Sequence, residues 1–103
     1  MKITNKEVIH GLNCIGAFLE AEKVANKALL SAKGEYAITT NKNRLVEVYK
    51  TFDEAKQGID DNAELENLLN TEVEILDFVK ITSDDFKDGI TANLIMSLEF
   101  MTE

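Results

Sequence analysis

Apolar residues between positions 38 and 59 follow a heptad repeat, the feature that most restricts how this chain can fold. The seam is interrupted only by Asn41, and its members are Ile38, Leu45, Val48, Phe52, Ala55 and Ile59. Charged residues lie off the seam, as in a helix that packs along its length against another helix. Poor helix formers at 39–43 leave the start open between Glu35 and Lys42, and Gly58 ends the helix.

The first 33 residues predict the partner helix. Thr4 and Glu7 match a capping box, so a helix begins there. One apolar stripe follows at helical spacing: Val8, Leu12, Ile15 and Leu19. A second stripe lies on another face: Cys14, Phe18, Ala21, Ala25, Ala28 and Ala32. Gly34 after a basic last turn resembles a C-terminal cap, while internal Gly and Asn residues permit a break near Glu22. The two helices predict an antiparallel hairpin.

The rest of the chain predicts shorter elements. Asp60–Asn62 provide caps for a short helix that ends at Asn70. Alternating residues from 71 to 81 predict a half-buried strand with a bulge at Leu76 and Asp77. The candidate partners are residues 2–4 and residues 36–38, of which we prefer 2–4. Thr91 caps a last helix with the apolar face Leu94, Ile95, Leu98 and Met101. We expect one α+β domain, 1–103, mainly helical: an antiparallel hairpin with a short strand or two-stranded sheet and a C-terminal helix.

Composition excludes several classes of function. The net charge of −8 and a pI near 4.6 argue against direct binding to nucleic acid or anionic membranes. A single cysteine is typical of a reducing compartment, and the chain shows neither a signal peptide nor a membrane-spanning run. We therefore expect a cytoplasmic protein.

Candidate chemistry is sparse. His10 and Cys14 are neighbours on one helix face, but they are the only His and Cys, so a structural role for Cys14 is favoured over a nucleophile or zinc site. Loops starting at Asp53 and Asp84 fail the calcium-loop pattern at position three. Glycine-rich phosphate loops are absent, and no pair among the 19 acids stands out. We expect no catalytic residues, no metal and no cofactor.

Charge is distributed unevenly along the chain. Residues 1–50 carry net +3 and residues 51–103 carry net −11. One interpretation is a solvated face that keeps the protein soluble. The sharper interpretation is an acidic surface that docks a basic partner protein. Its predicted residues are Asp53, Glu54, Asp60, Asp61, Glu64, Glu66, Glu72 and Glu74.

Three segments carry packing motifs. Residues 1–6 form an extended start, residues 67–75 contain an LLxTEV-like run that leads into a strand, and residues 90–101 end in LEFM. Together they resemble a family of small uncharacterised phage and prophage proteins of Gram-positive bacteria. Members of that family often have a proline between the hairpin helices and another where Ala92 stands here. The resemblance implies a phage protein working in the bacterial cytoplasm and transfers no catalytic residue.

Three functions follow as hypotheses. The first is a non-enzymatic phage protein that modulates a host protein, such as a nuclease or immune effector, through the acidic surface. The alternative is an assembly module that self-associates as a homo-oligomer through the helical hairpin. The third is a small hydrolase or metalloprotein using His10 and Cys14.

Overall fold

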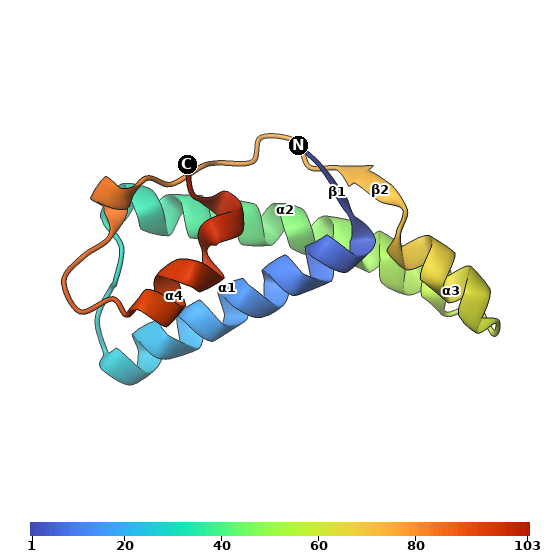
Figure 1. Ribbon diagram of the computed structural model, residues 1–103, viewed down its shortest axis with the longest axis horizontal. Helices are drawn as coiled ribbons and strands as arrows, with labels where there is room; N and C mark the ends of the chain where they lie inside the picture. Colours follow the sequence, from blue (N-terminus) through green and yellow to red (C-terminus); the bar gives the residue numbers. More distant parts are fainter.

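A computed structural model describes all residues, 1–103, as an elongated molecule of 47 × 26 × 19 Å. Two long antiparallel helices form its frame (Figure 1). The elements in chain order are β1 Lys2–Thr4, α1 Asn5–Ala25, α2 Ala32–Lys56, α3 Asn62–Leu69, β2 Glu72–Glu74, the 3-10 turn η1 Ser83–Asp85, α4 Ala92–Ser97 and the 3-10 turn η2 Glu99–Met101. The expected fold class is confirmed: mainly helical, with a hairpin, a two-stranded sheet and a C-terminal helix.

The capping box at the start of α1 forms as predicted. The Glu7 N–H donates to Thr4 Oγ1 at 3.1 Å, and the Thr4 N–H donates to Glu7 Oε1 at 3.0 Å. The helix ends at Ala25, where Asn26 adopts a left-handed conformation with φ of 55°. A continuous helix to Lys33 is therefore not formed, and the break lies a few residues beyond Glu22.

The prediction that Gly34 caps the first helix was wrong, because Gly34 lies in the first turn of α2. Ser31 caps that helix, and its Oγ accepts from the Gly34 N–H at 3.1 Å. A Cβ on Gly34 would lie 2.9 Å from Leu30 Cβ and 3.2 Å from Asp85 Cβ, so the glycine lets the buried residues Leu30 and Asp85 pack against the helix. The second helix consequently starts before the predicted window.

The heptad seam faces the interior of the hairpin. Ile38, Leu45 and Phe52 of α2 are buried, as are Val8 and Ile15 of the first stripe on α1. The second stripe of α1 contributes mainly Phe18, which is fully buried, whereas its alanines at 25, 28 and 32 are exposed. One face of α1 therefore supplies most of its packing, and the small residues lie largely in solvent.

Asn41, the polar interruption of the seam, is fully buried and bonds to backbone. The Val79 N–H donates to Asn41 Oδ1 at 2.8 Å, and Asn41 Nδ2 donates to the Val79 carbonyl at 2.7 Å. This pair of bonds replaces strand pairing for the segment that runs back along α2 after β2 (Figure 1). It holds that segment against the middle of the hairpin.

The strand predicted for residues 71–81 pairs with residues 2–4 as expected, but it is shorter than predicted. β2 pairs antiparallel with β1, with Ile3 opposite Val73. The strand ends at Glu74, although the Ile75 N–H still donates to the Met1 carbonyl at 2.8 Å. Asp77 has a φ of 56°, which turns the backbone at the predicted bulge. Further along, Ile81 forms only an isolated bridge to Thr102.

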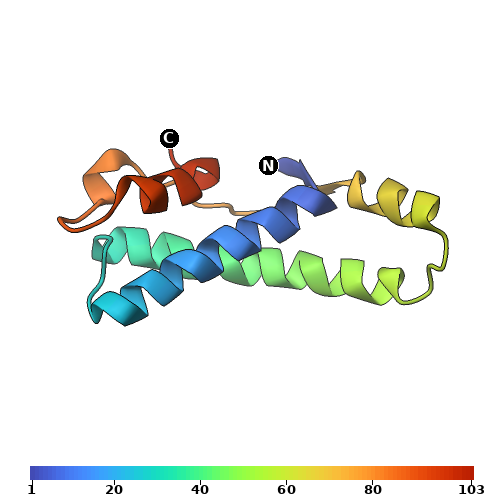
Figure 2. The ribbon, with the colours of Figure 1, turned by 60° about the horizontal axis from the view of Figure 1, so that its bottom comes forward.

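The C-terminal segment covers the hairpin near its turn (Figure 2). The Ile81 N–H donates to the Met101 carbonyl at 2.8 Å, and Leu98 and Met101 are fully buried. A Cβ on Gly11 would lie 3.2 Å from Phe100, so the missing side chain makes room for this ring on α1. The single predicted last helix is divided into α4 and η2.

Replacing Asn41 by Leu, which has a similar size, should lower the free energy of unfolding by about 2–4 kcal/mol. The reason is that the Val79 N–H and carbonyl lose their partners, and each unsatisfied buried group costs about 1–3 kcal/mol. Urea unfolding followed by far-UV circular dichroism measures the change. Asn43→Leu at an exposed position of the same helix is the matched control, and equal losses in both variants would contradict the role of Asn41.

Candidate functional site

The acidic residues concentrate in one part of the molecule. Residues 51–78 contain nine acidic residues and one basic residue, net −8, and the remainder is balanced at ten of each. These residues form the end of α2, α3 and the region around β2, at the end of the molecule opposite the α1–α2 turn (Figure 1). The excess of acidic residues therefore lies toward one end of the molecule, to which the pairing of β1 with β2 also brings the basic residues Lys2 and Lys6.

The eight acidic residues predicted to bind a partner lie in this region, and seven of them are exposed. Asp53 is half-buried. Three of the exposed ones also have structural contacts. Asp61 caps α3 by accepting from the Ala63 N–H at 2.9 Å, Glu74 accepts from the N-terminal ammonium at 3.2 Å, and Glu66 accepts from Asn70 Nδ2 at 3.5 Å. The other four exposed ones are Glu54, Asp60, Glu64 and Glu72.

An apolar hollow of about 320 Å³ opens within this acidic region. Phe52, which is 5% exposed, contributes to the hollow and lies outside the main hydrophobic core. The lining residues are Asn5, Val48, Thr51, Phe52, Ala55, Leu68, Thr71 and Val73. Sequence reasoning missed this hollow, although the small Ala55 at a seam position was the available sign of incomplete filling.

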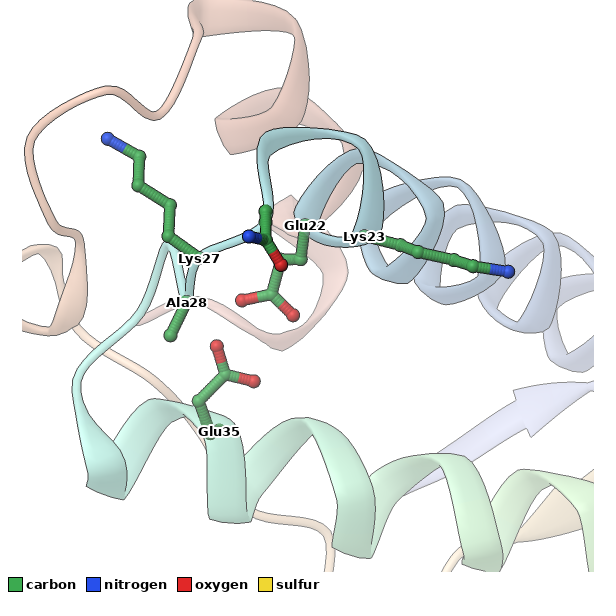
Figure 3. Close-up of a pocket in the computed structure, with 6 residues that line it drawn as sticks. Glu22, Lys23, Lys27, Ala28 and Glu35 are labelled. Carbon is green, nitrogen blue, oxygen red and sulfur yellow. The ribbon is translucent and has the colours of Figure 1, made fainter.

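A second hollow, of about 360 Å³, lies at the α1–α2 turn. Figure 3 shows the Glu22 and Glu35 carboxyl groups facing each other there, one from each helix. Glu22 Oε2 accepts from the Leu29 N–H at 2.8 Å, whereas Glu35 Oε1 is buried with no hydrogen-bond partner. Burial, followed by the facing Glu22 carboxylate, raises the pKa of Glu35 to about 7. The pair is thirteen residues apart in sequence, so no spacing rule singled it out.

Glu35 should make the protein less stable as pH rises from about 4.5 to about 7. Its carboxyl has a higher pKa in the folded state, so the folded state binds more protons in this window and unfolding becomes easier as they are lost. Urea unfolding at several pH values measures the slope. Glu35→Gln should flatten it, and Glu20→Gln at an exposed position of α1 should not; an unchanged slope in Glu35→Gln would contradict the assignment.

His10 and Cys14 do lie side by side, with 3.5 Å between His10 Nε2 and Cys14 Sγ. Burial raises the pKa of the Cys14 thiol, the opposite of what an activated nucleophile needs. No group of three or more His, Cys, Asp or Glu side chains is placed to hold a metal ion. The geometry therefore favours the structural interpretation of Cys14.

The Cys14 thiol should react more slowly with a disulfide reagent at neutral pH than free cysteine does. A raised pKa leaves less thiolate, and the thiolate is the reactive form. The rate of thionitrobenzoate release from Ellman's reagent measures this. A rate above that of free cysteine would show an activated thiol and reopen the hydrolase hypothesis.

No protein-family model, curated protein or solved structure matches the chain. None of its helices has both the length and the apolar character needed to cross a membrane.

Proposed function

We propose that this protein is a non-enzymatic binding protein whose acidic end docks on a basic surface of a partner protein. The observation that supports this most is the placement of the entire net charge of −8 in residues 51–78. Charge that only keeps a protein soluble serves equally well anywhere on the surface. Charge gathered at one end attracts an oppositely charged partner and orients it during encounter.

The fold supports a rigid docking surface. α3 is tied to the start of α1 because Asn5 Nδ2 donates to the Leu68 carbonyl at 2.9 Å and the Asn5 N–H donates to the Thr71 carbonyl at 3.0 Å. The two acceptors, Leu68 and Thr71, lie in the sequence between Glu66 of α3 and Glu72 of β2. A surface fixed in this way loses little conformational entropy on binding.

The resemblance to phage and prophage proteins supports a host protein in the bacterial cytoplasm as the partner, with a nuclease or another immune effector as the expected class. Such proteins present basic surfaces to nucleic acid, and an acidic protein competes for those surfaces by charge. Modulation of a host protein is thus part of the proposal.

Self-association through the hairpin is the alternative proposal. It depends on the heptad seam, of which Ile38, Leu45 and Phe52 are buried within a single copy. A homo-oligomer would therefore need a different face of the molecule. Binding through the acidic end is preferred because its residues are exposed.

Reversing four exposed charges should weaken partner binding by about tenfold or more and reduce its salt dependence, because screened charge attraction supplies much of the encounter. The variant is Glu54→Lys, Asp60→Lys, Glu66→Lys and Glu72→Lys, which spares the helix cap Asp61. The immobilised protein first retains partners from a bacterial lysate, and a retained protein is then purified and titrated at several salt concentrations.

The matched control changes the same number of charges elsewhere: Asp84→Lys, Asp88→Lys, Glu99→Lys and Glu103→Lys, all exposed. It should retain the partner with an affinity close to that of the unmodified protein. Equal affinity in both variants would show that the acidic end does not contact the partner.

A further inference from the structure

The apolar hollow beside Phe52 lies inside the acidic region and has nothing of this chain in it. We propose that it receives one large apolar side chain from a basic amphipathic segment of the partner. This inference rests on the proposed function and adds the chemistry of the partner: an apolar anchor flanked by lysine or arginine.

The size and lining of the hollow suit such an anchor. A cavity of about 150 Å³ in a protein core is enough to hold benzene, and this one measures about 320 Å³. Phe52 and Val48 from α2, Leu68 from α3 and Val73 from β2 supply apolar contact. Buried anchors in well-packed pockets contribute most of the affinity in protein interfaces.

The charges around the hollow indicate a basic partner. Glu72 and Glu54 are exposed, and each is a neighbour in sequence of a lining residue, Val73 and Ala55 respectively. Glu64 lies one turn before Leu68 on the same face of α3. The bases at this end of the molecule are Lys50 and Lys56 of α2 and Lys2 and Lys6 at the start of the chain, fewer than the nine acidic residues of 51–78. Apolar contact at the centre with charge around it is the usual anatomy of a specific interface.

A second copy of the chain is a poorer occupant. A two-fold dimer through this surface would bring two ends rich in acidic residues into contact, and like charges opposite each other disfavour association. A small apolar molecule would leave the surrounding carboxylates without a role. A basic segment satisfies both the hollow and its surroundings.

The test uses the full chain and a fluorescein-labelled synthetic peptide of lysines and leucines in helical alternation with one central phenylalanine, followed by fluorescence anisotropy. We expect one peptide per chain. Changing the peptide phenylalanine to serine should weaken binding by about tenfold, as loss of one anchor does, and this change leaves the protein untouched. A peptide with glutamate in place of lysine should not bind.

On the protein, Ala55→Trp should fill the hollow and weaken peptide binding to a similar extent, whereas Ala63→Trp, exposed on α3 outside the lining, should not. Circular dichroism checks that both variants fold. Equal binding of the phenylalanine and serine peptides, or unaltered binding by Ala55→Trp, would overturn the anchor site.

The four-charge variant separates this inference from the proposed function. If it loses the peptide while the anchor changes have no effect, the acidic docking surface stands and the anchor site fails. If it binds as tightly as the unmodified protein, docking of a basic segment by charge fails. If the peptide still binds when its lysines are replaced by glutamate, the site is apolar and does not select for charge. If the protein sediments as a dimer that Ala55→Trp dissociates, a second copy occupies the hollow. Either result contradicts a basic partner.

Discussion

The arrangement of this protein depends on the two hydrogen bonds between the Asn41 amide and the Val79 backbone. A helical hairpin alone leaves one side of its seam uncovered, and the segment after β2 is too irregular to pair as a strand. The buried amide supplies the donor and acceptor that a neighbouring strand would otherwise provide. The chain is thereby directed back along α2, and the C-terminal residues Leu98 and Met101 reach the core.

That path also separates the charges. The end of α2, α3 and β2 remain beyond the covered part of the hairpin, and they carry nearly all of the unbalanced acidic residues. Since α3 contributes no fully buried residue, it closes incompletely over Phe52 and leaves the hollow. The acidic surface and the hollow therefore lie at the same end of the molecule, the end farthest from the C-terminal cover.

Local patterns predicted much of the fold. The capping box at Thr4, the short helix after Asp61 and the pairing of residues 2–4 with 72–74 follow from hydrogen bonding between near neighbours or from alternation. The prediction that Gly34 ends the first helix was wrong because the sequence does not distinguish a glycine that ends a helix from one that admits a close neighbour. The strand was overestimated because apolar alternation continues past Asp77, where the backbone turns.

By itself the sequence determined the helical hairpin, the caps and the excess of acid in the second half, because these depend on periodicity, side-chain hydrogen bonds over a few residues and counting of charges. Only the tertiary structure decided which acids share a surface, that Glu22 faces Glu35, and that a hollow lies beside Phe52. Such features join residues distant in the chain, and their geometry depends on how completely side-chain volumes fill the space between packed elements.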